Sequence, residues 1–233
     1  MPRKPVTFIR FFSYTSCLLN CSQKSAQVVS PYSSLILLFS QYSFIPASQS
    51  DFSIILDHAL DGFIRIEPHS VAVGMTREST TQMLEYMVGS SLHWPYSIKV
   101  IDKTTDKLIG FRLMSVLHKD SSLNYEPFRL DLDKQTEDVQ IICTLVDELK
   151  QEIWKEIPHA KKILHRDITF ISPQHTRKGI AQSLLHHNIS MSALVDEKFD
   201  GIQAEASSFA NQNLLAKNGY KKLLQSKEYV QYD

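Results

Sequence analysis

The sequence predicts an α/β fold in which a mixed central sheet is flanked by helices. Short apolar runs alternate along the chain with longer segments whose apolar residues recur at helical spacing. Two of the runs, 97–101 and 108–117, flank a short polar turn and predict an antiparallel hairpin at the centre of the sheet. A later run leads directly into the stretch 172–185, where a strand is followed at once by a helix.

The composition is that of an ordinary globular protein, and it narrows the classes of partner. The 233 residues are 43% hydrophobic and 21% charged, with a formal net charge of zero. Because basic residues are not in excess, we expect no nucleic-acid partner. Three cysteines do not make a disulfide framework, and Cys17 and Cys21 have no second Cys or His pair nearby, so we expect no metal site.

The N-terminal segment differs in composition from the rest of the chain. The first 50 residues contain eleven serines, and no Asp or Glu precedes Asp51. This composition is typical of an organelle transit peptide, although a disordered extension or a wrongly assigned gene start has the same pattern. We therefore divide the chain into an N-terminal extension, 1–40, disordered or transit-like, and a folded domain, 41–233. The apolar run 35–39 is too short to cross a bilayer, so we expect no membrane association and a cytoplasmic protein, with the mitochondrion as the alternative.

The first half of the domain is expected to begin with one strand and two helices. Residues 41–46 alternate in polarity and end at a proline, which predicts a strand. Asp51 is the expected N-cap of a helix that ends at Gly62. A mixed segment broken by Pro68 follows, and the spacing then predicts a second helix over 77–89.

The second half is expected to continue the alternation of helices and strands. The polar stretch 119–135 predicts a long loop that either folds over an acceptor or lies on the surface. A helix is expected over 137–157, a strand over 161–172 and a helix over 178–194. The remaining expected elements are a strand, a helix and one or two closing strands, at 201–207, 209–219 and 221–232.

The turn between the expected strand and helix at 172–185 has the chemistry of an anion site. A helix N-terminus presents unpaired backbone N–H groups and the positive end of the helix dipole. Gly179 would let a ligand approach the backbone, and Arg177 and Lys178 add positive charge. The stretch matches neither a Walker loop nor a dinucleotide turn. Taken alone, it could also be an ordinary turn with a solvated basic pair.

Two stretches of the sequence resemble the GNAT superfamily of acetyl-CoA-dependent N-acyltransferases, and the resemblance covers residue 41 to the C-terminus. The pyrophosphate loop of that family reads Gln/Arg-x-x-Gly-x-Gly/Ala, and residues 179–181 match its second half. Thr176 replaces the Gln or Arg. The residues 218–220, Asn-Gly-Tyr, stand where the family has Leu-Gly-Phe, and Leu215 occupies the position of a Tyr that many members use as an acid.

The resemblance implies a cofactor site built mainly from the loop backbone. The family holds the pantetheine arm in a widened gap between its fourth and fifth strands, beside this loop. The cofactor-binding residues that it implies are Ile171, Ser172, Thr176, Arg177, Lys178, Gly179, Ile180, Ala181 and Asn211.

The stretch 62–74, GFIRIEPHSVAVG, resembles the Phe-Phe-x-x-Glu-Pro element of the invertebrate arylalkylamine N-acetyltransferase group. The resemblance implies that Glu67 is the general base, and burial that raised its pKa would suit that role. Two serines assist in that group; one falls on Ser207 and the other on Asn211, which is a departure. Without the resemblance, the residues themselves favour a helix-capping or salt-bridged carboxylate beside a proline turn at Glu67.

His165 and Asp167 form a rival pair for the role of base. Two residues apart on a strand, they face the same side of the sheet. Vertebrate relatives place two histidines at these strand positions, and His165 matches the first. The alternative is a partly exposed strand histidine next to an acid. His186 and His187 are expected to be solvated.

The resemblance implies transfer of acetyl from acetyl-CoA to a primary amine, such as an arylalkylamine, by direct attack without an acyl-enzyme. Two other functions remain open at this point: acetylation of protein lysines or N-termini, and a non-catalytic CoA-binding module. The departures at Thr176, Asn211 and Leu215 favour the last of these. The sequence leaves the oligomeric state open.

Overall fold

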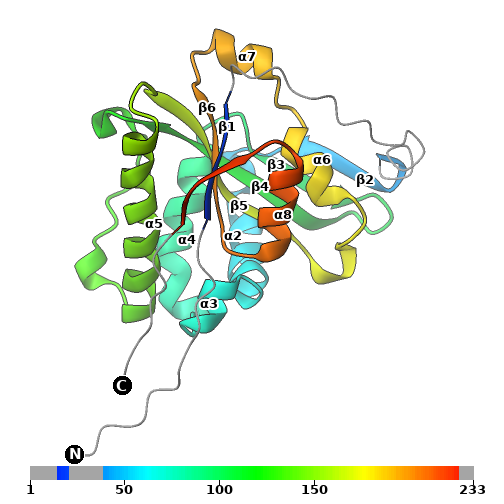
Figure 1. Ribbon diagram of the computed structural model, residues 1–233. Helices are drawn as coiled ribbons and strands as arrows, with labels where there is room; N and C mark the ends of the chain where they lie inside the picture. The colour runs from blue at the N-terminus through cyan, green and yellow to red at the C-terminus, as the bar shows by residue number, and fades with distance from the viewer. Residues whose placement is uncertain (1–14, 21–38, 226–233) are drawn as a thin grey trace, which may run out of the picture.

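The computed structural model describes residues 15–20 and 39–225, and its seven strands form one sheet (Figure 1). The strand order across the sheet is β2-β3-β4-β5-β6-β1-β7. The strands are β1 (Thr15–Asn20), β2 (Tyr42–Pro46), β3 (Ile98–Asp102), β4 (Lys107–His118), β5 (Lys162–Ile171), β6 (Gly201–Ala206) and β7 (Lys221–Gln225).

Helices cover both faces of this sheet, so the molecule has three layers (Figure 1). The helices are α2 (Phe52–Asp61), α3 (Pro68–Ala72), α4 (Arg77–Leu92), α5 (Glu137–Glu156), α6 (Ile180–His186), α7 (Met191–Asp196) and α8 (Phe209–Lys217). Short 3₁₀ turns lie at Gln49–Asp51, Phe63–Arg65, Ser121–Leu123, Leu132–Lys134 and Pro173–His175. None of the helices in the described ranges is both long and apolar enough to cross a membrane.

Separate apolar clusters hold the two helical layers on the sheet. On one face, Leu84 of α4 and Val139 of α5 pack against Phe111 of β4. On the other face, Leu185 of α6 and Leu215 of α8 pack with side chains of β5 and β6. Because each face of the sheet is apolar, the strands read as apolar runs with few polar interruptions. The polar residues that do interrupt these runs are described below.

The sheet is mixed, as predicted. β2, β3, β4 and β5 pair antiparallel, and β5 pairs parallel with β6. The predicted hairpin is the pair β3–β4, and the predicted helix over 137–157 is α5. The α/β fold with a mixed sheet between helices is therefore confirmed.

β5 and β6 separate after a short paired stretch. Their pairing covers only Ile163–Arg166 opposite Gly201–Ala204, although β5 continues to Ile171. Beyond Arg166, β5 has backbone pairing on its β4 side alone. The sheet therefore opens between β5 and β6 at the end that leads to the turn at 172–179.

The strand β1 comes from the segment that we expected to lie outside the domain. Thr15–Asn20 pairs antiparallel with β6 on one side and with β7 on the other. In the described chain, β1 is thus the strand that joins β7 to the rest of the sheet. The domain boundary at residue 41 stays a prediction, but this part of the predicted extension is a strand of the fold.

The predicted helix over 178–194 is wrong in its length. The chain forms α6, leaves helical geometry at His187–Ser190, and begins α7 at Met191. Asn188 has φ 55°, a left-handed conformation that a continuous helix does not contain. Nη1 of the buried Arg112 donates to the carbonyl oxygens of Leu184 and His187, so the last turn of α6 is satisfied by a side chain from the sheet.

Two other helix predictions differ in detail from the structure. The helix predicted over 77–89 continues to Leu92, because Gly89 keeps helical geometry and Pro127 packs over it. A Cβ on Gly89 would lie 3.2 Å from Cβ of Pro127, so the glycine permits this close approach. The mixed segment around Pro68 contains the short helix α3, with the proline at its first position.

The long polar loop, 119–136, packs along α4. The ring of Tyr125 stacks on His93 with centroids 3.6 Å apart, and Phe128 meets Tyr86 edge to face. The carbonyl of Tyr125 accepts a hydrogen bond from the Ser90 hydroxyl. These contacts make the loop part of the α4 layer of the molecule.

Candidate functional site

The turn between β5 and α6 has the geometry of an open backbone cradle. Gly179 is the residue before α6 and has φ 84°, while Arg177 has φ 61°. A Cβ built on Gly179 would meet nothing within 4 Å, so its surface faces open space. Thr176, Arg177 and Lys178 are exposed, and Lys178 Nζ also lies 3.2 Å from the hydroxyl of Tyr42. A ligand could therefore reach both the backbone and the basic side chains here.

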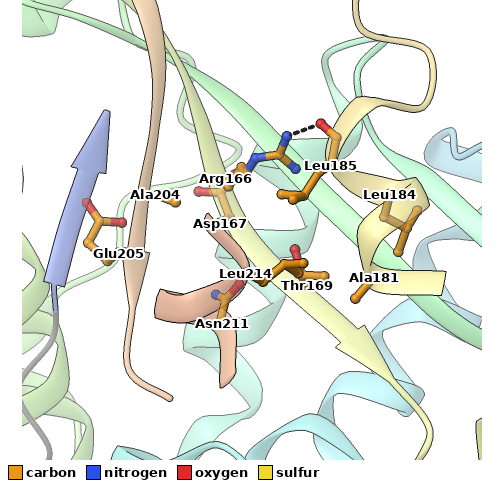
Figure 2. Close-up of a pocket in the computed structure, with 10 residues that line it drawn as sticks. All are labelled: Arg166, Asp167, Thr169, Ala181, Leu184, Leu185, Ala204, Glu205, Asn211 and Leu214. Atoms are coloured by element: carbon orange, nitrogen blue, oxygen red, sulfur yellow. Dashed lines mark hydrogen bonds between the residues drawn. The ribbon is translucent and has the colours of Figure 1, made fainter. Parts of the chain in front are cut away.

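A pocket lies in the opening between β5 and β6 (Figure 2). It contains about 370 Å³ of empty space, solvent at its mouth included. α6 supplies Ala181, Leu184 and Leu185, whereas α8 supplies Asn211 and Leu214. The strands supply the remaining lining residues, which are Arg166, Asp167, Thr169, Ala204 and Glu205.

The pocket joins several of the residues predicted for the cofactor. Ala181 lies two residues after Gly179, and Asn211 lies on the first turn of α8. Two predicted cofactor-binding residues from separate parts of the chain therefore line the same pocket. Ile171 and Ser172 lead out of β5 toward the turn, and Ile180 is buried behind it. Thr176, Arg177 and Lys178 line the exposed turn and not the pocket. Leu215 is the residue of α8 that is buried in the core.

Glu67 is the N-cap of α3, so it is the helix-capping carboxylate considered in the sequence analysis. Its Oε2 accepts from the backbone N–H and from the hydroxyl of Ser70, each at 2.6 Å. Its Oε1 accepts from the backbone N–H of His69 at 3.2 Å, and Nδ1 of the same ring lies at 3.2 Å. These bonds tie the carboxylate to the start of α3.

The pKa of Glu67 is shifted in the direction opposite to the one that would suit a general base. Burial raises the pKa, as we expected, but hydrogen bonds from His69, Ser70 and Ser207 outweigh it and lower the pKa to about 2. The carboxylate is 6% exposed and is ionised at neutral pH. The hydrogen bond from Ser207 joins two residues 140 positions apart that the sequence resemblance had placed in one site.

His165 is buried in a charged cluster, so the alternative of a partly exposed histidine is wrong. It is 2% exposed, its Nδ1 lies 2.9 Å from Oδ1 of Asp167, and its Nε2 contacts Oε2 of Glu205. Burial lowers the pKa of His165, but the two carboxylates outweigh it and raise the pKa to about 9. The ring is therefore an imidazolium whose two nitrogens both face carboxylates.

Asp167 reaches His165 from a β-bulge. The register between β4 and β5 shifts at this point: Leu113 pairs with Ile168, and Met114 pairs with Arg166. Asp167 is the extra residue, and bulges often redirect a side chain next to a functional site. Its carboxylate also accepts hydrogen bonds from Ser91 at 2.9 Å and Ser115 at 3.0 Å. Burial raises the pKa of Asp167, but the His165 imidazolium outweighs it and holds that pKa below its ordinary value.

Sequence reasoning missed two residues of the site, Glu205 and Arg166. Glu205 lies on β6 two residues before Ser207, and its side chain is 6% exposed. Arg166 follows His165 in the sequence and is buried. Its Nε donates to the hydroxyl of Tyr220 at 2.9 Å. Both residues could have been found from the sequence, because each is a charged residue within an apolar strand and a buried charge needs a partner.

The remaining predicted residues lie apart from the pocket. His186 is exposed and bonds to Asn218, and His187 is half-buried with its ring stacked on Phe44, so only the first is solvated as expected. Among residues 15–20 and 39–225, no group of three or more His, Cys, Asp or Glu is arranged to hold a metal ion.

Comparisons with known proteins identify the fold. No protein-family model and no curated protein matches the chain. Among solved structures, arylalkylamine N-acetyltransferase 2 from Aedes aegypti is similar with a TM-score of 0.62 and 21% identity, over 76% of this chain and 82% of that one. The C-terminal condensation domain of Ebony, solved with β-alanyl-dopamine, has a TM-score of 0.61 and 20% identity, over 79% and 84%.

A third solved structure, the polyamine N-acetyltransferase of Drosophila melanogaster, has a TM-score of 0.61 at 9% identity and covers 82% of this chain and 92% of that one. At these identities the likeness concerns the fold. The described chain therefore has the fold of the GNAT N-acetyltransferases.

Proposed function

We propose that this protein transfers the acetyl group of acetyl-CoA to a primary amine by direct attack of the amine on the thioester. The observation that carries the proposal is the opening between β5 and β6, which lies beside the turn at Gly179. Beyond Arg166, β5 is not paired with β6, and the turn has open space around Gly179, so both features offer backbone groups to a ligand. Together they fit a thin arm that ends in phosphates.

The residues around this opening suit acetyl-CoA. The exposed backbone around Gly179, with Arg177 and Lys178, would hold the pyrophosphate, and the strand opening would admit the pantetheine arm. Asn211 and Ala181 would contact the arm from the two helices. When bound, acetyl-CoA supplies the acyl group as a reactive thioester.

We assign an electrostatic role to Glu67 and not that of a direct base. A carboxylate with a pKa of about 2 is fully ionised at pH 7 but holds a proton weakly. An alkylammonium has a pKa near 10, so direct proton removal by this carboxylate is unfavourable. Glu67 would instead orient Ser207 through their hydrogen bond, and its negative charge would favour a positively charged acceptor. His165 would position the carboxylates of Asp167 and Glu205, because both of its nitrogens are engaged.

The acceptor class rests on likeness of fold and chemistry. The similar structures include enzymes named for arylalkylamines and for polyamines, so the proposal covers small primary amines. No metal takes part in the proposed reaction, and the acceptor carries the nucleophile itself.

The test uses the full chain, because β1 comes from residues before 41. The protein is incubated with acetyl-CoA and tryptamine, tyramine, dopamine, agmatine or spermidine, and free thiol is measured together with the mass of the acetylated product. We expect thiol release with at least one amine. Release only with lysine peptides or with peptide N-termini would make it a protein acetyltransferase. Tight acetyl-CoA binding without release to any acceptor would make it a binding module.

Substitution of Glu67 and Ser207 separates the two roles considered for Glu67. If Glu67 acts electrostatically, Glu67→Gln and Ser207→Ala each lower kcat/KM. In both variants, kcat/KM should still fall at low pH as in wild type, because that fall reflects protonation of the amine. A direct base would contribute its own acid limb in wild type, and Glu67→Gln would remove that limb. An unchanged kcat/KM in both variants would remove Glu67 and Ser207 from the reaction.

A further inference from the structure

The last turn of α6 is held by side chains of the sheet as well as by backbone. A helix leaves its last four carbonyl groups without intrahelical partners, so each needs another donor. In α6, two of these carbonyls accept from backbone N–H groups just beyond the helix. The other two, those of Leu184 and Leu185, accept from guanidiniums. Nη1 of Arg112 on β4 donates to Leu184, and Nη2 of Arg166 on β5 donates to Leu185 at 2.5 Å.

Both guanidiniums are buried among neutral acceptors. Arg112 is 0% exposed and also donates to the carbonyls of His187 at 2.9 Å and Tyr96 at 2.6 Å. Arg166 is 5% exposed, and its Nε donates to the hydroxyl of Tyr220 at 2.9 Å. Within the described ranges, Nε of Arg112 and Nη1 of Arg166 have no hydrogen-bond partner. The bonds named here are therefore the polar contacts that hold the two guanidiniums in place.

The strands β4 and β5 bring the two arginines to the same face of the sheet. Arg166 lies opposite Met114, and Arg112 lies two residues before Met114 on β4. Burial, and then the charge of Arg166, lower the pKa of Arg112 to about 9, so the group is still charged at pH 7. A buried cation is costly unless acceptors surround it. The arginines thus need the carbonyls of α6 as much as those carbonyls need donors.

The residues that the arginines hold are also residues of the pocket. Leu184 and Leu185 line the opening between β5 and β6 together with Ala181, and we call these three residues the α6 wall. The dashed line in Figure 2 joins Arg166 to the carbonyl of Leu185. The position of α6 therefore sets the width of the pocket on this side. Arg166 lines the pocket itself, whereas Arg112 does not, so Arg112 can act on the pocket only through α6.

Hydrogen bonds fix the α6 wall in a way that apolar packing does not. Leu185 packs with side chains of β5 and β6, and Leu184 packs with side chains of β3 and β4. Apolar contact is non-directional, so it brings the helix to the sheet without fixing its rotation or its height. A guanidinium is planar and donates in fixed directions. Two of them, anchored on adjacent strands, fix both the rotation and the height of the last turn.

We propose that Arg112 and Arg166 are positioning residues for the acyl donor, because they hold the α6 wall at the distance from β5 and β6 that admits the pantetheine arm. This inference rests on the proposed function and adds to it the residues that shape the donor pocket. Neither arginine takes part in the chemical step. A change that keeps the charge but loses the planar fork should therefore weaken binding of the donor.

The first test replaces each fork by a single ammonium. Arg112→Lys and Arg166→Lys keep the positive charge, so they separate geometry from charge. Arg129→Lys, at an exposed position on the loop 119–136, is the matched control. The Kd for CoA is measured by calorimetry on the full chain, at a temperature where circular dichroism shows each protein to be folded. We expect the Kd to rise at least tenfold in the two buried variants and less than twofold in the control.

A purely structural role gives a different result in the same experiment. It would lower the temperature of unfolding of Arg112→Lys and Arg166→Lys while the folded proteins bound CoA as wild type does. That result in both variants would overturn the proposal. Wild-type affinity in one of them would remove that arginine from the positioning role.

Tyr220→Phe tests the anchoring of Arg166 by a smaller change, and it decides the question if the lysine variants do not fold. It removes the hydroxyl that accepts from Nε of Arg166 but keeps the ring, whose centroid lies 5.8 Å from Cζ of that arginine. We expect the Kd for CoA to rise at least threefold. Tyr125→Phe, on the loop 119–136, is the control and should change the Kd less than twofold. An unchanged Kd in folded Tyr220→Phe would contradict the anchoring.

The kinetic constants distinguish a shifted donor pocket from a general loss of activity. In Arg112→Lys we expect the KM for acetyl-CoA to rise at least tenfold, while the KM for the amine stays within twofold of wild type. Equal rises in both KM values would overturn a role confined to the donor.

The same measurements separate this inference from the proposed function. CoA binding that is weakened in the lysine variants, without thiol release to any amine, would keep the positioning role and remove the acetyl transfer. Acetyl transfer by wild type, with an unchanged Kd for CoA in the lysine variants and in Tyr220→Phe, would keep the function and remove the positioning role. A wild-type protein that binds no CoA would remove both.

Discussion

The turn at 172–179 and the cluster of His165, Asp167 and Glu205 are assigned to one reaction, yet they are built in different ways. The turn is exposed, its positive charges are solvated, and its ligand surface is backbone around a glycine with φ 84°. The cluster is buried, it carries opposite charges in contact, and its residues come from β5 and β6. Changes in the turn should therefore alter ligand binding, whereas changes in the cluster should alter stability as well.

The largest expected effect comes from removing the cation of the cluster. His165→Leu leaves Asp167 and Glu205 buried against each other without the imidazolium, and breaking a buried ion pair in this way costs about 3–5 kcal/mol. Urea unfolding followed by circular dichroism measures the loss. His159→Leu, at an exposed position, is the control and should change the free energy of unfolding by less than about 0.5 kcal/mol. Equal losses in both variants would show that the cluster does not stabilise the fold.

The charge of His165 also sets an alkaline limit on stability. Its pKa is raised to about 9 in the folded protein from 6.5, so its stabilising contribution is fully present below pH 6.5 and is lost as the pH rises through about 9. Wild-type protein should therefore lose stability between pH 7 and pH 10, and His165→Leu should lose less over that interval. The measurement is the midpoint of urea unfolding at each pH; parallel curves for the two proteins would contradict the assignment.

Glu67 should limit stability at the opposite end of the pH scale. Its pKa is lowered to about 2 from 4.5, so its contribution is present above pH 4.5 and is lost as the pH falls toward 2. A shift of this size corresponds to about 3 kcal/mol. Wild type should lose most of that contribution, about 2 kcal/mol more than Glu67→Gln, between pH 5 and pH 2.5, as measured by urea unfolding. If the free energy of unfolding fell equally with pH in wild type and in Glu67→Gln, the carboxylate would not be bonded to α3 as described.

Gly179 allows backbone strain and ligand contact to be separated. Gly179→Ala places a Cβ in open space at φ 84°, so we expect a loss of about 1–2 kcal/mol from the left-handed backbone alone. Gly74→Ala is a matched control, because Gly74 has φ 75° and its Cβ would also meet nothing within 4 Å. Both variants should lose similar stability, but only Gly179→Ala should weaken acetyl-CoA binding. Equal binding by both would exclude the turn from the cofactor site.

The smallest effect on stability is expected from the basic pair of the turn. Arg177→Ala and Lys178→Ala remove exposed charges, so the free energy of unfolding should change by less than about 0.5 kcal/mol. The Kd for acetyl-CoA should rise, and wild type should lose more of its affinity at high salt than either variant, because salt screens exposed charges. Salt dependence that is the same in all three proteins would assign the basic pair to solvent.

The sequence predicted those parts of the fold that rest on local pattern. The β3–β4 hairpin follows from two apolar runs around a polar turn, and α5 follows from helical spacing that ends before Pro158. The single helix predicted over 178–194 was wrong because its apolar spacing continues through Asn188, where the backbone turns left-handed. Arg112 from β4 satisfies the carbonyls at that break, and no local pattern contains that contact.

The candidate site divides in the same way. The glycine turn could be recognised because its chemistry lies within a few consecutive residues. The pairing of Glu67 with Ser207, and of His165 with Glu205, joins positions far apart in the chain. The packing of β6 beside β5 brings Glu205 to His165, and the residue that follows β6, Ser207, meets Glu67 at the start of α3. Burial alone raises the pKa of Glu67, and the hydrogen bonds that lower it could be found only in the structure.

The sequence by itself thus determined the α/β class, the order of most elements and the place of the glycine turn, because these depend on the periodicity and backbone preferences of neighbouring residues. The tertiary structure alone decided how far β5 and β6 stay paired, which carboxylates share the His165 ring, and which donor of Arg166 is left unused. Those properties depend on desolvation and on contacts between distant segments, which have no counterpart in local sequence.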